Sequence, residues 1–344
     1  MSSALPVADG PAVYAIHENP EWFGVFREAF EAEGVPLVEW LLVDGPLDPL
    51  AVPPDGVFWS RISASSHTRG HALSKEYARS VLAWLESNGR RTVNGRAVLE
   101  LEVSKVAQLA ALKRAGIEVP RTVAAIGTAH LVDVARDFHR ELAAPFIVKH
   151  NQGGKGLSVA RFESPDDLEA AIARGDLDEP QDGITLVQEY VPPAEPFITR
   201  VEIVGGEFLY AIRADTARGG FQLCPADACA IDPATGKPIT PPGATIAPQP
   251  GDQLFSLREG FRHPIIDQYL AFTRANGIEI AGIEFIETAD GRLVTYDVNT
   301  NTNYNAAVEA VAPDSGARAI ARYLGGLLAD ASAGRLAQSG HPAR

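Results

Sequence analysis

The first hundred residues alternate between short apolar runs and longer segments with helical periodicity. The apolar runs predict strands at 12–17, 36–43 and 56–62, and the periodic segments predict helices at 21–34 and 75–89. Both predicted helices end at a glycine, a common helix terminator. Because strands that alternate with helices favour crossover connections, we expect a parallel β-sheet covered by helices.

The middle of the chain mixes helices with strands that follow one another more closely. Its predicted elements are helices at 100–116, 131–142 and 165–175, a strand at 122–127, two strands joined by a glycine-rich loop within 145–162, and a strand at 184–191. A hairpin is expected at 198–215, with Gly205-Gly206 as its two-residue turn.

The segment 216–262 contains many Pro and Gly residues and little periodicity. A loop of this length in a compact protein is commonly functional or disordered. Regular elements then return, with a helix at 263–277, strands at 279–288 and 292–300, and a last helix near 306–329.

Composition describes an ordinary globular protein, with 344 residues of which 46% are hydrophobic and 22% charged. The formal net charge of -14 argues against a partner that is nucleic acid or an anionic membrane, and no apolar run is long enough for a membrane span. Cys224 and Cys229 are the two cysteines. They are too few for a disulfide framework, so we expect reduced thiols in a cytoplasmic protein.

The first candidate site is the glycine-rich loop that follows Lys149. A strand delivers this lysine, and glycines let backbone N–H groups approach phosphate oxygens. The residues expected to bind a nucleotide here are Lys149, Gly153, Gly154, Lys155 and Gly156. Because the loop matches neither the Walker pattern nor GxGxxG, the alternative is a hairpin with a flexible tip.

The second candidate site is a set of oxygen ligands on the strands 279–288 and 292–300. Asp297 and Asn299 alternate, so both side chains leave the same face of their strand. Antiparallel pairing would bring Glu284 beside them, and two carboxylates with an amide oxygen suit Mg²⁺. The alternative is a pair of solvated acids, although an unpaired carboxylate flanked by Ile283 and Phe285 would be costly.

Two further features are weaker on their own. The segment Gln188–Val191 ends a strand whose free backbone groups suit a flat heteroaromatic ring, although strand-end core is the simpler interpretation. Arg200 and Arg213 lie in the two hairpin strands, where they are expected to face phosphates or a substrate carboxylate unless they are solvated.

Taken in order, these segments resemble the ATP-grasp fold between about residues 100 and 325, and within it the RimK-like carboxylate–amine ligases. The resemblance rests on SKVAQLAALKRAGIEVPRT, PFIVKHNQGGKGLSV, VQEYV, GIEFIET and YDVNTN. It implies that Lys105 and Lys149 bind the phosphates of ATP, that the adenine is held by Gln188, Glu189, Tyr190 and Val191, and that Glu195 meets the ribose. It also implies magnesium ligation, by two ions for which manganese can substitute, through Glu284, Asp297 and Asn299.

The implied fold class is α/β, with two α+β ATP-grasp subdomains that enclose ATP behind an N-terminal α/β domain with a parallel sheet. The expected boundaries are 1–98 for the N-terminal domain, 99–190 for the central subdomain with its glycine-rich lid, 191–330 for the C-terminal subdomain with the metal site, and 331–344 for a flexible tail.

The implied activity is an ATP-dependent ligase that forms an amide or peptide bond through an acyl phosphate and releases ADP and phosphate. Arg213 and Arg200 are the expected catalytic residues, with Arg213 stabilising the tetrahedral oxyanion. Small-molecule carboxylate and amine substrates are the expected partners, and a dimer or tetramer is consistent with such relatives.

Two departures from the family pattern affect this expectation. The family usually has Glu at the position of Asp297, and its Arg-x-Asn segment after the hairpin is missing here. The alternatives are a phosphotransferase that acts on a small-molecule hydroxyl, a non-catalytic nucleotide-binding module, and a ligase with a thiol acceptor. A substrate-carboxylate site near Arg61, His67 and Arg69 is a further hypothesis, since these polar residues follow a predicted strand.

Overall fold

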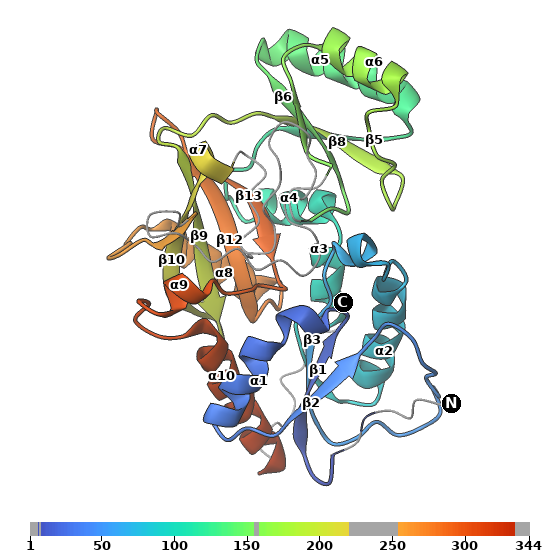
Figure 1. Cartoon of the computed structure of the whole chain (residues 1–344), viewed down its shortest axis with the longest axis vertical. Coiled ribbons are helices and arrows are strands. Elements are labelled where there is room, and N and C mark those ends of the chain that lie inside the picture. Colours follow the sequence, from blue (N-terminus) through green and yellow to red (C-terminus); the bar gives the residue numbers. More distant parts are fainter. Residues whose placement is uncertain (1–5, 7, 155–157, 220–253, 334–344) are drawn as a thin grey trace.

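The computed structural model describes residues 6, 8–154, 158–219 and 254–333, and these residues form three β-sheets with helices packed on them (Figure 1). The first sheet contains β1 (Ala12–His17), β2 (Leu37–Leu41), β3 (Gly56–Arg61) and β4 (Arg91–Val93) in the order β2-β1-β3-β4. All its pairings are parallel, which confirms the prediction. Helices α1 (Gly24–Ala32) and α2 (Ser74–Ser87) supply the crossovers expected between parallel strands.

The second sheet lies at the top of Figure 1 and is antiparallel. It contains β5 (Thr122–Ile126), β6 (Phe146–His150), β7 (Ala160–Phe162) and β8 (Ile184–Glu189) in the order β5-β8-β6-β7. Helices α5 (Leu131–Leu142) and α6 (Pro165–Arg174) pack against it, so that Phe138, Leu168 and Val187 share one buried cluster.

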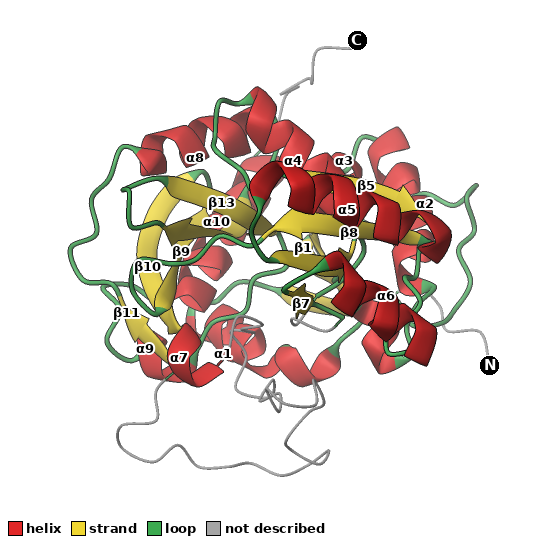
Figure 2. Ribbon diagram, turned by 90° about the horizontal axis from the view of Figure 1, so that it is seen from above, coloured by secondary structure: helices red, strands yellow, loops and turns green. Residues whose placement is uncertain are grey.

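The third sheet is also antiparallel and carries much of the site described below. Its strands are β9 (Phe197–Val204), β10 (Glu207–Asp215), β11 (Phe255–Leu257), β12 (Ile280–Glu287) and β13 (Leu293–Asn299), in the order β11-β10-β9-β12-β13. Helices α4 (Lys105–Arg114) and α8 (Ile265–Ala275) lie along this sheet (Figure 2). They bury Leu112, Tyr269 and Phe272 against Ile283 and Phe285.

Two predicted helices are each divided in the structure. The predicted helix 100–116 is α3 (Arg96–Glu102) followed by α4, because the Ser104 hydroxyl accepts a hydrogen bond from Ala107 N and caps a new helix. The predicted helix 306–329 is α9 (Ala306–Glu309) followed by α10 (Gly316–Ser332), whose cap is Ser315. Strand β11 was missed within 216–262, because its pairing with β10 is a tertiary contact.

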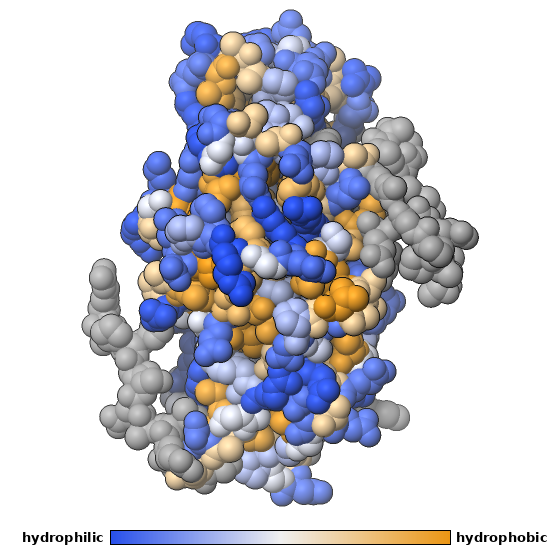
Figure 3. All heavy atoms as spheres, turned by 90° about the vertical axis from the view of Figure 1, so that its left-hand side faces the viewer, coloured by the Kyte–Doolittle hydropathy of each residue, from blue (hydrophilic) through white to orange (hydrophobic). Residues whose placement is uncertain are grey.

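The remaining elements are short. They are the 3₁₀ helices η1 (Pro20–Trp22), η2 (Ser66–Arg69) and η3 (Thr128–His130), and the single-turn helix α7 (Thr216–Gly219). None of the helices in the described ranges is long and apolar enough to cross a bilayer. Figure 3 shows hydrophilic and hydrophobic residues interspersed on one face of the molecule. The two cysteines lie outside the described residues.

The last helix, α10, returns to the N-terminal sheet. Its buried residues Ile320 and Leu324 share a cluster with Phe26 and Trp59 of the N-terminal part and with Ile280 of β12. The N-terminal sheet and the five-stranded sheet therefore share one apolar core, which fixes their edges relative to each other.

Asn94 adds polar contacts to this junction. Its side chain donates to Ile280 O at 2.8 Å and to Thr300 O at 3.1 Å, and it accepts from Glu279 N at 3.0 Å. The residue is 2% exposed and has a φ of 50°, in the left-handed region that Asn tolerates better than most residues.

We expect Asn94→Ala to lower the free energy of unfolding by about 2–4 kcal/mol, because buried backbone groups lose their partners. Urea unfolding followed by circular dichroism would measure this loss. Asn94→Gly should show most of the same decrease, although glycine tolerates the positive φ. Asn88→Ala, at an exposed helix end, should lower the free energy of unfolding by less than about 1 kcal/mol. Equal effects at positions 94 and 88 would contradict this account of the junction.

Candidate functional site

A cavity of about 400 Å³ lies where the three sheets meet. The loop after β3 forms one wall, β6 and β8 form a second, and β9, β12 and β13 form a third. The predicted site residues that line it are Lys105, Lys149, Gly153, Gly154, Gln188, Glu189, Tyr190, Val191, Arg200, Glu284, Asp297 and Asn299. Residues from all three sheets thus converge on one space.

The three predicted oxygen ligands lie on adjacent strands of the third wall. Glu284 of β12 is paired in register with Asp297 of β13, and Asn299 Nδ2 donates to Glu284 Oε1 at 3.3 Å. Directly opposed residues of an antiparallel pair face the same side of a sheet. The structure therefore brings these side chains together in the way that the strand pattern predicts.

Arg200 of β9 fixes the position of Glu284. Its guanidinium donates to Glu202 Oε1 at 2.6 Å through Nε and to Glu284 Oε1 at 3.2 Å through Nη1. All three residues are buried. Burial raises the pKa of Glu284 above the usual range of a carboxyl, and Arg200 opposes this shift. Tyr296 OH also donates to Glu284 Oε2, at 2.7 Å, so both carboxylate oxygens have partners.

Two lysines supply positive charge to the cavity, and only one of them is ion-paired. Lys105, at the first turn of α4, is ion-paired with Asp297. Burial tends to raise the pKa of Asp297, but the Lys105 ammonium outweighs burial and holds this pKa below its usual range. Lys149 has no hydrogen-bond or ion-pair partner among the described residues, and burial together with Lys105 lowers its pKa to about 8. An ammonium that is half-buried, faces the cavity and has no ion-pair partner suits an anionic ligand.

The glycine-rich loop approaches the N-terminal wall. A Cβ atom built on Gly154 would lie 2.8 Å from Ser65 Cβ, so this position has no room for a side chain without movement. Gly153 and Gly154 line the cavity, whereas Lys155 and Gly156 lie outside the described residues.

The segment 188–191 lines the cavity at the end of β8. Gln188 Nε2 donates to Thr122 Oγ1 at 2.8 Å, and the Tyr190 ring lies 4.2 Å from the Arg161 guanidinium carbon. Glu195, by contrast, is an exposed residue outside the cavity lining.

The position of Arg213 differs from the expectation that it shares the cavity with Arg200. Arg200 pairs in register with Ile212, so Arg213 leaves the opposite face of the sheet, where it is exposed and packs over Phe197. The cause is a register shift between Phe208 and Tyr210. In a two-residue hairpin without a register shift, Arg200 would pair with Ala211, and Arg213 would lie on the same face as Arg200. A shift of one residue places Arg213 on the opposite face.

Sequence reasoning missed the rest of the N-terminal wall and the segment after β13. The cavity residues missed there include Trp22, Ser63, Ala64, Ser65, Glu102, Asn301 and Asn303. Two signals were available: the polar run that follows β3, since ligands often bind beyond the carboxyl ends of parallel strands, and the alternating asparagines of the segment 299–305.

The hypothesis of a substrate site formed by Arg61, His67 and Arg69 is changed by their contacts. Arg69 is bound to Glu18 through Nε at 3.0 Å and through Nη2 at 2.5 Å, and His67 Nδ1 lies 3.3 Å from Ala64 O. Arg61 is buried and contacts the segment after β13. Arg69 and His67 therefore support the wall, whereas Arg61 joins β3 to the segment after β13.

Comparison with known proteins supports the expected ATP-grasp fold. Residues 103–224 match the family model for the RimK-like ATP-grasp domain. A probable alpha-L-glutamate ligase from Teredinibacter turnerae is 31% identical over 150 residues, which are 42% of this chain and 46% of that protein. The chain thus spans about half the length of that relative. A ribosomal protein bS6–L-glutamate ligase from Salmonella newport is 26% identical over 247 residues, or 71% of each chain.

Solved structures are similar over nearly the whole chain. D-cycloserine synthetase DcsG has a TM-score of 0.62 at 17% identity and covers 92% of this chain and 100% of its own. A RimK domain ATP-grasp protein from Sphaerobacter thermophilus has a TM-score of 0.61 at 19% identity, covering 91% and 98%. Macrocyclase MdnC from Microcystis aeruginosa, bound with precursor peptide MdnA, has a TM-score of 0.59 at 16% identity, covering 91% and 98%. The predicted ATP-grasp fold is confirmed.

The lowered pKa of Lys149 predicts that affinity for Mg-ATP depends on pH. Phosphate binding needs the charged ammonium, which is lost as pH rises through about 8. We expect the Kd of a non-hydrolysable ATP analogue with magnesium, measured by calorimetry, to rise about tenfold between pH 7 and pH 9.

Lys149→Arg is the matched control, because its side chain stays charged over this range and should flatten the profile. A wild-type Kd that does not change with pH, or an arginine variant with the same rise, would show that Lys149 does not carry this dependence.

Proposed function

From the premise that this chain contains a RimK-like ATP-grasp domain, we propose that it is an ATP-dependent ligase that joins a carboxylate to an amine through an acyl phosphate, with release of ADP and phosphate. The observation that carries this proposal is one cavity in which Lys105 and Lys149 face Glu284, Asp297 and Asn299. Two ammonium groups suit phosphate oxygens, and the opposed oxygen ligands suit a hard cation.

The residues fit magnesium on the chemistry of their donor atoms. Glu284, Asp297 and Asn299 would hold the metal, which would neutralise and orient the phosphate oxygens of ATP when bound. Among the described residues no group of three or more His, Cys, Asp and Glu side chains is placed to hold a metal ion. Two carboxylates with one amide offer oxygen donors that suit an ion that keeps water and borrows phosphate ligands, as Mg²⁺ does. We propose two such ions, with manganese as a substitute.

The mechanism follows from charge. A carboxylate must attack the γ-phosphorus, and both partners are negative. In our proposal Lys105 and Lys149 neutralise phosphate oxygens, which lowers this repulsion, and Gly153 and Gly154 bring backbone N–H groups to the same oxygens. Exclusion of water from the cavity in the complex would protect the acyl phosphate until the amine attacks and displaces phosphate.

The roles of the two arginines are revised. Arg213 is not proposed for the oxyanion, because its side chain leaves the opposite face of the sheet. Arg200 lines the cavity but its guanidinium is committed to Glu202, Glu284 and Thr302. We therefore propose Arg200 as a positioning residue that orients Glu284.

One relative is named for a ribosomal protein, one similar structure is bound to a precursor peptide, and another is a D-cycloserine synthetase, so peptides and small molecules are both candidates here. A phosphotransferase would use the same lysines and oxygen ligands, with a hydroxyl in place of the amine.

The direct test is ADP release by the purified protein with Mg-ATP, pooled carboxylates and pooled amines. We expect release to require both pools. Lys149→Ala should reduce it at least a hundredfold, because a charge that stabilises the transition state is lost. Asp297→Asn, which keeps the shape of the side chain, should reduce it similarly.

Arg213→Gln is the matched control, since it removes an arginine on the other face of the same sheet and should leave the rate within about twofold. ADP release with pooled alcohols and without amines would favour the phosphotransferase. ATP binding without ADP release in every pool would favour a non-catalytic module.

A further inference from the structure

The two proposed phosphate lysines belong to different cores of the protein. Lys105 begins α4, whose Leu112 packs into the core of the five-stranded sheet with Ile283. Lys149 lies in β6, whose Val148 packs in the separate core of the second sheet. Because neither apolar core holds both lysines, the contacts between α4 and the end of β6 decide how far apart the two ammonium groups lie.

Asn151, the residue after β6, makes these contacts. Its backbone O accepts from Lys105 N at 3.2 Å, and its side-chain Oδ1 accepts from Val106 N at 2.9 Å and from Ser104 Oγ at 3.3 Å. The first N–H groups of a helix have no partners within the helix itself. Asn151 thus supplies acceptors for the first two N–H groups of α4, and one of these belongs to Lys105.

Asn151 is also fixed to its own sheet. Its backbone N donates to Ile184 O, at the start of β8, at 3.0 Å, and its Nδ2 donates to Asp182 Oδ2 at 2.7 Å. The other oxygen of Asp182 accepts from Ile184 N at 3.1 Å. Asn151 is 4% exposed, so all four of its polar atoms are buried and have partners. The residue therefore joins α4 to the second sheet through both its backbone and its side chain.

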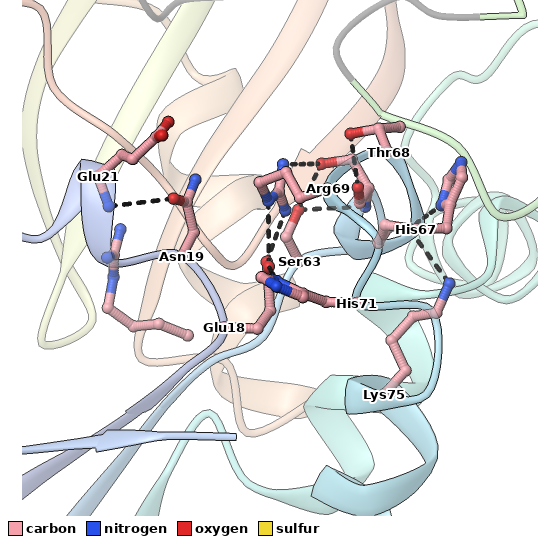
Figure 4. A network of polar contacts seen from close by, with 12 residues as sticks. Glu18, Asn19, Glu21, Ser63, His67, Thr68, Arg69, His71 and Lys75 are labelled. Carbon is pink, nitrogen blue, oxygen red and sulfur yellow. Dashed lines mark hydrogen bonds and ion pairs between the residues drawn. The ribbon is translucent and has the colours of Figure 1, made fainter. Parts of the chain in front are cut away.

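The loop that begins at Asn151 reaches the N-terminal wall at Gly154, where a Cβ atom would lie 2.8 Å from Ser65 Cβ. The wall is cross-linked by the polar network of Figure 4. In this network Arg69 donates from Nε to Glu18 Oε2 at 3.0 Å and from Nη1 to Ser65 Oγ at 3.3 Å. The loop thus runs between two fixed points, with Asn151 on α4 at one end and the wall at the other.

Asn151 does not line the cavity, so it can act on a ligand only through its neighbours. Lys149 lies two residues before it, and Gly153 and Gly154, which do line the cavity, follow it. Because Asn151 also receives Lys105 N, a movement of Asn151 changes the spacing of the two lysines and the start of the loop together. Charged groups at a site act fully only when neighbouring hydrogen bonds hold them in the productive geometry.

We propose that Asn151 is a positioning residue that sets the spacing of Lys105 and Lys149 across the cavity and so adapts the site to a ligand with several linked phosphates. The inference rests on the nucleotide site of the proposed function. Asp182 contributes, because its contact with Nδ2 fixes the orientation in which Oδ1 faces α4. An amide suits this position because it donates on one side and accepts on the other.

The test compares two ligands of the purified full chain by calorimetry. One is a non-hydrolysable ATP analogue with magnesium, and the other is adenosine, which has no phosphates. We expect Asn151→Ala to raise the Kd of the analogue roughly tenfold to a hundredfold, since the two lysines lose part of their common anchor. The Kd of adenosine should change less than about twofold, because the segment 188–191 is left intact.

Two further variants test the contact with Asp182. Asn151→Asp keeps an acceptor for α4 but sets a carboxylate against Asp182, and like charges repel. Adding Asp182→Asn exchanges the acid and the amide, restores a donor and an acceptor, and keeps the net charge of the wild type. We expect the double variant to bind the analogue at least about fivefold more tightly than Asn151→Asp alone, as a double-mutant cycle would show.

Ser164→Ala is the matched structural control. The Ser164 hydroxyl accepts from Asp167 N at 3.2 Å and caps α6, which packs on the same sheet, and neither residue lines the cavity. This variant therefore loses a helix cap in the same part of the chain without touching the lysines. Both Kd values should stay within about twofold of the wild type.

Equal losses of Asn151→Ala on both ligands, no loss on the analogue, or a double variant that binds no better than Asn151→Asp would each overturn the positioning role while leaving the nucleotide site in place. A wild-type protein that binds the analogue no more tightly than adenosine would overturn the nucleotide site, and with it the proposed ligase and this inference.

Discussion

The site depends on one buried cation, Arg200, in the middle of the five-stranded sheet. It lies between Glu202 on its own strand and Glu284 on the next, and it also donates to Thr302 Oγ1. A Cβ atom on Gly282 would overlap this guanidinium, so glycine is needed there. By pairing with both carboxylates and with the segment after β13, Arg200 offsets the cost of burying acids beside the proposed nucleotide site.

The sequence was sufficient for features that depend on local periodicity. Alternation along β13 correctly places Asp297 and Asn299 on one face, and apolar runs around Glu284 correctly predict a buried strand. The parallel N-terminal sheet follows from the alternation of strands and helices. In each case one repeat of two or 3.6 residues determines which way a side chain points.

Features set by irregular pairing could not be predicted. The shift between Phe208 and Tyr210 turns Arg213 away from the cavity, and a second shift, next to Glu284, lets Tyr296 reach the cavity beside Asp297. Strict alternation would place Tyr296 and Asp297 on opposite faces. Bulges of this kind leave little trace in a single sequence, because they depend on the partner strand as much as on the bulged one.

The balance of charge around the cavity supports the proposed nucleotide site. Lys105 is ion-paired with Asp297, and Arg200 with Glu202 and Glu284, whereas Lys149 forms no ion pair in the described part of the chain. Lys149 belongs to β6 and lines the cavity together with the segment 188–191. In a protein of net charge -14, a lysine left without an ion pair beside a cavity is suited to an anionic ligand. The proposed ligase, which must bind a triphosphate, has that requirement.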